Sequence, residues 1–450
     1  MTTTPAPTMQ SSAADQLRER LESRTAVIGI VGLGYVGLPL AKAVHDAGYG
    51  VLGYDVDEQK VKLLKKGENY LKHLGAELTE TLSKSNRFDA TTDSSRLGEA
   101  DVVVLCVPTP LGEHREPDLS FVLDSTRMVA QTLRRGQLVV LESTTYPGTT
   151  RDEMMPILDA TGLVCGVDYF LAYSPEREDP GRIGFTTSSI PKLVGGVGDV
   201  ATDLAMAFYT RSIASVHRVR TAEIAEAAKL LENIFRAVNI ALVNELKTLL
   251  TDMDIDVWEV IAAASTKPFG FMPFYPGPGL GGHCIPIDPF YLTWKAKEIG
   301  HATKFIELAG EINAQMPHYV VTRVMGALND ERKALRGSKV LVIGIAYKPN
   351  IDDIRESPAA EIIELLWDNG AEVAYHDPHV PSFPRMRKHD IGLSSVALDE
   401  KSLASYDCVL IVTDHSAVDY SLLGRSAKLI VDTRNAMANV ASPKARIVKS

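Results

Sequence analysis

One thiol in the chain lies in a segment whose residue types could carry out covalent chemistry. Cys284 lies within YPGPGLGGHCIPIDPF, residues 275–290, a run of glycines and prolines that forms neither a regular helix nor an interior strand. A cysteine thiolate is a strong nucleophile and a good leaving group, so it forms and releases thioesters readily. The segment therefore predicts a loop that presents Cys284 as a catalytic nucleophile, with a thiol merely packed in a turn as the alternative.

The other cysteines give no sign of a metal or a disulfide. Cys106 and Cys408 lie in the apolar runs VVVLCV and CVLIV, which predict buried and inert thiols. No cysteine or histidine spacing is typical of zinc, so no metal is expected. Residues 1–22 lack the apolar centre of a signal peptide and predict a disordered tail. We therefore expect a reducing, cytoplasmic compartment.

A glycine motif near the N-terminus predicts the oxidant. TAVIGIVGLGYVG, residues 25–37, is an apolar strand that runs into G-x-G-x-x-G, formed by Gly32, Gly34 and Gly37. These glycines allow a tight turn, a close approach of a pyrophosphate and close packing of helix on strand. Asp55 ends the next strand-like run, where a carboxylate binds an adenosine ribose and repels a 2′-phosphate. The motif predicts NAD rather than NADP, with a glycine turn that only packs as the alternative.

The elements that must hold these groups alternate between strand-like and helix-like runs. This alternation predicts a mostly parallel sheet with ligands at the carboxyl ends of its strands, where PTP (108–110) and STT (143–145) lie. A stretch rich in Ala, Leu and Glu predicts one long helix over 222–253. The other predicted elements are strands within 100–110, 137–145, 169–176 and 191–196, and helices to about 264 and over 305–328.

The C-terminal third repeats the pattern of the first. SKVLVIGIAYK (338–348), AEVAYHDP (371–378) and SYDCVLIVTDH (405–415) take the places of strand runs in the N-terminal part. This copy lacks G-x-G-x-x-G and has Lys348 where close glycines would lie. It therefore predicts a smaller phosphate-bearing ligand, met by a cation, in place of a dinucleotide.

The bulk composition fits two or three globular domains. A chain of 450 residues is too long for one ordinary core, and its 45% hydrophobic and 23% charged residues are typical of a globular protein. No apolar run approaches the roughly 20 residues that cross a bilayer, so no membrane partner is expected. The net charge of −10 argues against a general nucleic-acid binder.

Four segments together resemble the UDP-glucose/UDP-N-acetylmannosamine dehydrogenase family. They are GLGYVGLPLA, AEAAKLLENIFRAVNIALVNE, GPGLGGHCIPIDPFYL and AYKPNIDDIRESPA, and the resemblance runs from about residue 25 to 440. It implies an α/β protein with two Rossmann-like doubly wound parallel-sheet domains joined by a long central helix. The expected parts are a tail (1–22), an NAD-binding domain (23–215), a central helical domain with the cysteine loop (216–328) and a UDP-sugar-binding domain (329–450).

The resemblance implies an enzyme that oxidises the C6 alcohol of a UDP-sugar to a carboxylate and reduces two NAD. Cys284 would hold the aldehyde as a thiohemiacetal and then as a thioester. Lys229 and Asn233, four residues apart on one helix face, would activate the alcohol and stabilise oxyanions. Asp288 would help to activate water or shape the surroundings of the thiol, and Glu176 would be the general base of thioester hydrolysis.

The remaining implied contacts fall into two sets. Thr144 matches a threonine that orders a water near the sugar. Thr145 is adjacent and close enough to be confused with it. The expected cofactor-binding residues are Gly32, Gly34, Tyr35, Val36, Gly37, Asp55, Val107, Thr109, Thr144 and Arg355. The expected substrate-binding residues are Glu176, Arg177, Lys229, Asn233, Tyr275, Gly281, Lys348 and Arg434. A homodimer or higher homo-oligomer built through the central helices is also implied.

Several of these residues have simpler readings. On pattern alone, Lys229 and Asn233 mark a solvated helix face. Asp288 could cap a helix that starts near Pro289, and Glu176 could be a surface carboxylate. Arg355 could form an ion pair with Asp352 or Asp353 in place of reaching NAD.

The cysteine loop favours an N-acetylhexosamine over glucose. The glucose branch usually has Lys before the aspartate, where this chain has Ile287, and His283 precedes the thiol. Phe274 and Tyr275 offer apolar surface to an acetamido methyl group. The motif most resembles UDP-N-acetylglucosamine 6-dehydrogenases that feed polysaccharide synthesis. UDP-N-acetylmannosamine, UDP-N-acetylgalactosamine and UDP-glucose stay open, because one group in an apolar pocket discriminates by only about 1–3 kcal/mol.

Two other functions compete with this one. A two-electron 3-hydroxyacid dehydrogenase also joins a dinucleotide domain to a helix with Lys and Asn four apart, but it lacks the cysteine loop and the second sheet. A non-catalytic nucleotide-sugar or NAD sensor predicts the loss of at least one chemical residue, whereas all of them are present in this sequence.

Overall fold

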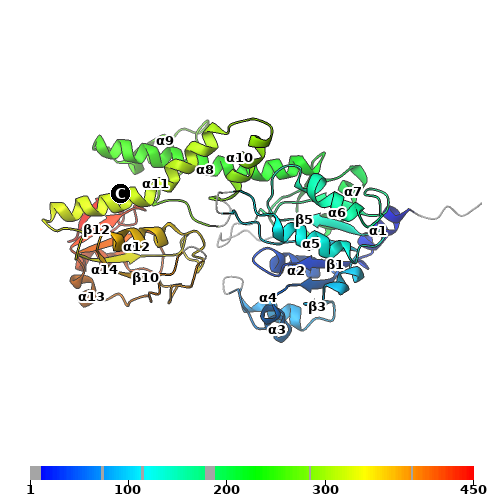
Figure 1. The fold of residues 1–450 in the computed structure, drawn as a ribbon. Helices are drawn as coiled ribbons and strands as arrows, with labels where there is room; N and C mark the ends of the chain where they lie inside the picture. The colour runs from blue at the N-terminus through cyan, green and yellow to red at the C-terminus, as the bar shows by residue number, and fades with distance from the viewer. Residues whose placement is uncertain (1–11, 72–74, 113–115, 178–187, 283–284, 387–388) are drawn as a thin grey trace, which may run out of the picture. The chain divides into compact units, whose positions relative to one another are not determined.

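The computed structural model describes residues 12–71, 75–112, 116–177, 188–282, 285–386 and 389–450. The chain forms two compact units, unit 1 (Met1–Leu231) and unit 2 (Glu232–Ser450), whose boundary falls inside the long helix α8 (Ala222–Asp252) (Figure 1). The helix predicted over 222–253 is confirmed as α8, while the bounds of the three predicted domains stay a prediction.

Unit 1 is built on an eight-stranded sheet in the order β3-β2-β1-β4-β5-β6-β7-β8. All neighbouring strands run parallel except β6 and β7, which are antiparallel. The strands are β1 (Val27–Val31), β2 (Gly50–Tyr54), β3 (Phe88–Thr91), β4 (Val102–Leu105), β5 (Leu138–Leu141), β6 (Phe170–Tyr173), β7 (Lys192–Gly196) and β8 (Val216–Arg218). The predicted doubly wound, mostly parallel sheet is therefore confirmed.

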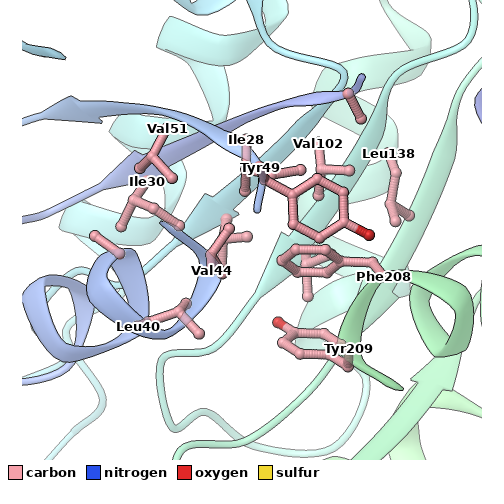
Figure 2. Packing of buried hydrophobic residues seen from close by; sticks show 14 of the residues in the cluster. Ile28, Ile30, Leu40, Val44, Tyr49, Val51, Val102, Leu138, Phe208 and Tyr209 are labelled. Carbon is pink, nitrogen blue, oxygen red and sulfur yellow. The ribbon is translucent and has the colours of Figure 1, made fainter. Parts of the chain in front are cut away.

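Helices cover both faces of this sheet because alternate strand residues point to opposite sides. Ile28 and Ile30 pack in one layer with Val44 and Phe208, as Figure 2 shows, whereas Val103 belongs to the opposite layer. The α-helices are α1 (Ala13–Glu22), α2 (Gly37–Asp46), α3 (Glu58–Lys66), α4 (Ala76–Ser83), α5 (Ser120–Ala130), α6 (Met155–Asp159) and α7 (Asp199–Ser212), with a 3-10 helix η2 (Ser94–Glu99) and a π-helix η3 (Thr149–Met154). Strands buried on both faces explain the continuous apolar runs in the sequence.

The N-terminal region departs from the prediction of a disordered tail over 1–22. Residues 13–22 form helix α1, whose N-cap Ser12 and Asp15 make a reciprocal capping box. Leu17 and Leu21, four residues apart, are 2% and 0% exposed in the core. The prediction of a disordered tail is wrong for residues 13–22. The polar residues around the two leucines made the stretch look like a tail, although it forms an amphipathic helix. Residues 1–11 lie outside the described part of the chain.

Unit 2 contains a five-stranded, fully parallel sheet in the order β10-β9-β11-β12-β13. Its strands are β9 (Lys339–Ile343), β10 (Glu372–His376), β11 (Cys408–Ile411), β12 (Leu429–Asp432) and β13 (Arg446–Lys449). Its helices are the second part of α8, then α9 (Val257–Ala264), α10 (Asp288–Glu298), α11 (Lys304–Asp330), α12 (Pro358–Asp368), α13 (Glu400–Ser405) and α14 (Tyr420–Ser426). The second parallel sheet predicted from the sequence repeat is confirmed.

The helices of unit 2 also cover both faces of its sheet. Val340 and Val342 pack with apolar residues of α11 and α12, and Leu341 and Ile343 pack with those of α13 and α14. In the described residues of the whole chain, no helix is long and apolar enough to cross a bilayer.

Candidate functional site

The glycine motif connects β1 to α2 in a geometry that suits a dinucleotide. Gly32 has a φ of +93°, and a Cβ there would lie 2.5 Å from the carbonyl oxygen of Cys106. A Cβ on Gly37 would lie 1.8 Å from the carbonyl oxygen of Gly32. A Cβ on Gly34, in contrast, would meet no atom within 4 Å. The outer glycines are therefore required by packing, while the middle one faces open space that a pyrophosphate would fill.

The acid at the end of β2 is fixed beside this motif. Asp55 is 5% exposed, and its two carboxylate oxygens accept the N–H groups of Leu33 (2.9 Å) and Asp57 (3.0 Å). Lys60 Nζ lies 3.3 Å from Asp55 Oδ2. Sequence reasoning missed Lys60, although a lysine five residues past the acid was a visible signal. The motif and Asp55 together fit the pyrophosphate and ribose of NAD.

Two strand-end loops are tied together next to the glycine motif. Ser143 Oγ, after β5, accepts the N–H of Val107 (3.0 Å) and donates to its carbonyl oxygen (2.7 Å), after β4. Thr109 is 4% exposed, and Thr144 is partly exposed. Thr145 is fully buried, and its hydroxyl finds no hydrogen-bond partner among the described residues. The structure thus leaves Thr144, rather than Thr145, accessible to a ligand.

The loop after β6 holds Glu176 and Arg177 in fixed contacts. Glu176 Oε1 accepts the N–H of Arg177 (2.7 Å), and Lys192 Nζ lies 3.6 Å from Glu176 Oε2. Arg177 Nη1 donates to the carbonyl oxygen of Pro191 (2.8 Å). The Glu176 side chain is only 14% exposed, so the surface-carboxylate reading is wrong.

Helix α8 buries the two residues that were predicted to stabilise oxyanions. Lys229 is 7% exposed and Asn233 is 8% exposed, so the reading of a solvated helix face is wrong. Glu226, one turn earlier and fully buried, accepts the N–H groups of Gly148 (2.6 Å) and Thr150 (3.0 Å). Burial raises the pKa of Glu226. Sequence reasoning missed Glu226, which anchors the start of α8 to the loop after β5.

In unit 2, Asn233 forms a buried hydrogen bond with Asp288. Asn233 Nδ2 donates to Asp288 Oδ2 over 2.5 Å, and Asp288 is 2% exposed. Asp288 is the first residue of α10, and the N-cap, Ile287, makes no side-chain capping bond. The reading of Asp288 as a helix cap is therefore wrong. Its carboxylate orients the Asn233 amide instead.

The cysteine loop is described on either side of its thiol. His283 and Cys284 themselves lie outside the described residues. A Cβ on Gly281 would lie 2.6 Å from Tyr347 Cβ, and Gly282 has a φ of +88° and donates its N–H to the carbonyl oxygen of Arg355 (3.0 Å). The glycines thus let the loop pack on the segment after β9, a reason that the sequence did not reveal.

Arg434 lies against the first part of this loop. Its Nη1 would be 2.5 Å from a Cβ on Gly277, and its Nε donates to the carbonyl oxygen of Val412 (2.9 Å). Burial lowers the pKa of Arg434, although Asp414 and Asp432 oppose the shift. The glycine at 277 is therefore what lets the guanidinium approach the backbone.

The other predicted contacts of unit 2 differ in their surroundings. Lys348 is partly buried in the segment after β9. Tyr275 is 56% exposed, and its ring stacks on Trp258 with centroids 5.7 Å apart. Arg355 forms a two-pronged ion pair with Asp353, with Nη2 2.6 Å from Oδ2. The ion-pair reading of Arg355 is what the structure shows, and a contact with NAD stays a prediction.

The second sheet uses its counterpart of Asp55 differently. Asp377, after β10, accepts the N–H groups of Ile345 (2.7 Å) and Ala346 (3.2 Å), and His415 Nε2 lies 3.0 Å from it. His415 Nδ1 accepts the N–H of Asn350 (3.0 Å), so Nε2 carries the proton that is donated to Asp377. This carboxylate is fully engaged by protein groups, which argues against a second ribose site.

The described cysteines are correctly predicted only in part. Cys408 is buried, and burial raises its pKa to about 12. Cys106, which follows the last residue of β4, is partly exposed as a residue, but burial raises the pKa of its thiol well above the usual value, as expected for an inert thiol. In the described residues, no group of histidine, cysteine and acidic side chains could hold a metal ion.

Known proteins resemble this chain over almost its whole length. The UDP-glucose/GDP-mannose dehydrogenase family matches with its NAD binding domain at residues 26–213, its central domain at 223–315 and its UDP binding domain at 341–439. Protein CapL of Staphylococcus aureus is 36% identical over 90% of this chain and 95% of its own. UDP-N-acetyl-D-glucosamine 6-dehydrogenase of Pseudomonas aeruginosa is 35% identical over 90% of this chain and 96% of its own.

A solved structure extends this likeness to the fold. UDP-D-ManNAc dehydrogenase from Pyrococcus horikoshii superposes with a TM-score of 0.84 at 34% identity, covering 94% of this chain and 99% of that one. Both the family domains and the shared fold agree with the glycine motif, the strand-end loops and the second sheet. The chain therefore belongs to the UDP-glucose/GDP-mannose dehydrogenase family and is an NAD-dependent nucleotide-sugar dehydrogenase.

Proposed function

We propose that this protein oxidises the C6 hydroxyl of a UDP-N-acetylhexosamine, with UDP-N-acetylglucosamine as the first candidate, to the uronic acid. The observation that carries the proposal is the buried Asn233–Asp288 hydrogen bond, because Asp288 lies only four residues beyond Cys284. Relatives of similar identity are named for N-acetylglucosamine and for N-acetylmannosamine, which supports the hexosamine class. UDP-N-acetylmannosamine, UDP-N-acetylgalactosamine and UDP-glucose are the alternative substrates.

NAD, when bound at the glycine motif, supplies the hydride acceptor for both oxidations. The Lys229 ammonium and the Asn233 amide would stabilise the alkoxide at C6, and Asp288 would hold that amide in place. The Cys284 sulfur would add to the aldehyde carbon, so that the half-oxidised sugar stays attached as a thiohemiacetal and then as a thioester. Glu176 would take a proton from the water that cleaves the thioester. Lys348 and Arg434 would bind the phosphates of the UDP-sugar.

A panel of UDP-sugars scored for NADH tests this proposal. We expect two NADH per molecule of sugar, with the highest kcat/KM for a UDP-N-acetylhexosamine. A yield of one NADH per sugar would contradict the four-electron route and favour a two-electron dehydrogenase. Binding of UDP-sugar and NAD without any NADH would favour the sensor.

We also propose that the protein works in the cytoplasm as a homodimer or higher homo-oligomer, making precursors for polysaccharides. The support for assembly is an apolar stripe on α8, since Leu242, Leu246 and Leu249 are 51%, 38% and 54% exposed at helical spacing, and Met253 in the turn after α8 is 57% exposed. Light scattering after size exclusion should show a multimer that Leu249→Glu converts to monomers. A monomeric wild-type chain would contradict the assembly.

A further inference from the structure

A buried lysine that no part of the mechanism above uses lies between two carboxylates of unit 1. Lys192 Nζ is 3.0 Å from Glu142 Oε2 and 3.6 Å from Glu176 Oε2, and it donates to the carbonyl oxygen of Pro175 (3.4 Å). Lys192 is 4% exposed and Glu142 is 1% exposed. A charged lysine is almost never fully buried unless it is paired, so this position calls for an explanation.

The antiparallel pairing of β6 and β7 in the unit 1 sheet explains how Lys192 reaches this place. Glu142 follows β5 and Glu176 follows β6, so both lie at the carboxyl end of the parallel strands. Lys192 is the first residue of β7, which runs antiparallel to β6. Its amino end therefore lies at the carboxyl end of β6, where the ligands of such sheets bind.

Glu142 is held rigidly behind the lysine. Tyr209 Oη, on α7, donates to Glu142 Oε1 over 2.5 Å, and Lys192 Nζ lies 5.2 Å from the centre of the Tyr209 ring. Tyr209 itself is fully buried in the core, as Figure 2 shows. The result is a chain of contacts from Tyr209 through Glu142 and Lys192 to Glu176.

The cluster holds two carboxylates and one ammonium. The groups that face one another are Glu142, Glu176, Lys192, Tyr209 and the Cys106 thiol. Burial alone would lower the pKa of Lys192, but Glu142 and Glu176 outweigh it and raise that pKa, so the ammonium stays charged. Burial raises the pKa of Glu142, although Lys192 opposes the shift. The single Lys192 ammonium thus faces two carboxylates, one on each side.

We infer that Lys192 and Glu142 are positioning residues: the Lys192 ammonium, held by Glu142, faces the Glu176 carboxylate that accepts the proton of the hydrolytic water. This inference rests on the proposed function. In that step the water oxygen bonds to the thioester carbon, one water proton passes to Glu176, and the C–S bond breaks with its electron pair leaving on the Cys284 sulfur. The acid that is released then ionises. Lys192 faces the Glu176 carboxylate before this proton transfer, and Glu142 keeps Lys192 paired after it.

Opposite substitutions in the pair test the inference. In single turnovers with UDP-N-acetylglucosamine and excess NAD, NADH absorbance reports the two oxidations, and acid-quenched samples report the protein-bound acyl group. Lys192→Met should move the acidic limb of the hydrolysis rate to higher pH, by about one pH unit or more, because Glu176 loses its positive neighbour. Glu142→Gln should move the limb to lower pH, because a negative neighbour is removed. Lys192→Arg should stay near the wild type.

The controls separate this role from a merely structural one. Arg134→Met removes a partner of the buried Asp101 (2.7 Å) at the amino end of the same sheet, and it should lower stability without moving the limb. The inference would be overturned if the acidic limb of the hydrolysis rate stayed in place in Lys192→Met and Glu142→Gln, or moved in the same direction in both. If Lys192→Met fails to fold, the direction of the Glu142→Gln shift decides. A wild-type enzyme that yields no NADH would instead overturn the proposed function.

Discussion

At the scale of single residues, several polar groups of the candidate site are already held by protein partners. Asn233 and Asp288 bond to each other, Glu176 lies beside Lys192, and Asp55 accepts two backbone N–H groups. Such pairs fix the direction of a donor before a ligand arrives, and a donor aimed in advance is what stabilises developing charge. The polar groups therefore serve the site and the fold together.

Removing the Asp288 carboxylate should separate these two roles. Asp288→Ala leaves the buried Asn233 amide without this acceptor, which should cost about 1–3 kcal/mol of stability. It should also lower kcat by roughly 100-fold, the scale of losing one oxyanion donor, because the amide is no longer held. Asp288→Asn keeps an acceptor oxygen, so its stability and its kcat should fall between those of the wild type and those of Asp288→Ala. Unfolding and steady-state assays check this, and an unchanged kcat in a destabilised Asp288→Ala would show that the carboxylate is only structural.

At the scale of elements, the sequence predicted those that local pattern determines. Helix α8 follows from a long stretch of good helix formers, and the strands follow from apolar runs between turn residues. The antiparallel direction of β7 was not predictable, because strand pairing depends on distant residues and not on local composition. Lys192, Glu142 and Glu226 were missed for the same reason, since in sequence each resembles a surface charge.

The glycines of the cysteine loop give a prediction at this scale. Gly281→Ala should destabilise unit 2 by about 1–3 kcal/mol and reduce activity, because its Cβ would lie 2.6 Å from Tyr347 Cβ. The matched control is Gly326→Ala in α11, where a Cβ meets no atom within 4 Å. That change should stabilise the helix by about 0.5–1 kcal/mol. Thermal melts and kcat values check both, and equal behaviour of the two variants would contradict the packing argument.

At the scale of the whole molecule, two sheets of similar design bind different ligands because their loops differ. The first has the glycine motif with open space at Gly34, and the second has Asp377 engaged by backbone groups and His415. The sequence revealed this difference through the missing glycines of the second copy. The sugar specificity could not be predicted, because it depends on a few apolar contacts rather than on the motif.

The stability of the protein should depend on pH through one buried lysine, Lys247. Lys247 is 2% exposed, and burial, aided by Arg434 and Arg323, lowers its pKa to about 7. Between pH 7 and about 10 the unfolded chain then binds a proton that the native chain does not, so stability should rise with pH by about 1 kcal/mol per unit. Urea unfolding of Lys247→Met should lack this rise, while the exposed Lys297→Met keeps it. A rise of equal size in all three proteins would contradict the assignment.

The covalent role proposed for Cys284 is tested by the mass of the enzyme that is quenched with acid during turnover of UDP-N-acetylglucosamine. We expect an acyl-sugar adduct that maps to the peptide containing Cys284, together with two NADH per sugar. We also expect that Cys284→Ser makes no adduct and fails to complete the second oxidation. If Cys284→Ser produced two NADH per sugar at a rate near that of the wild type, the covalent role of Cys284 would be contradicted.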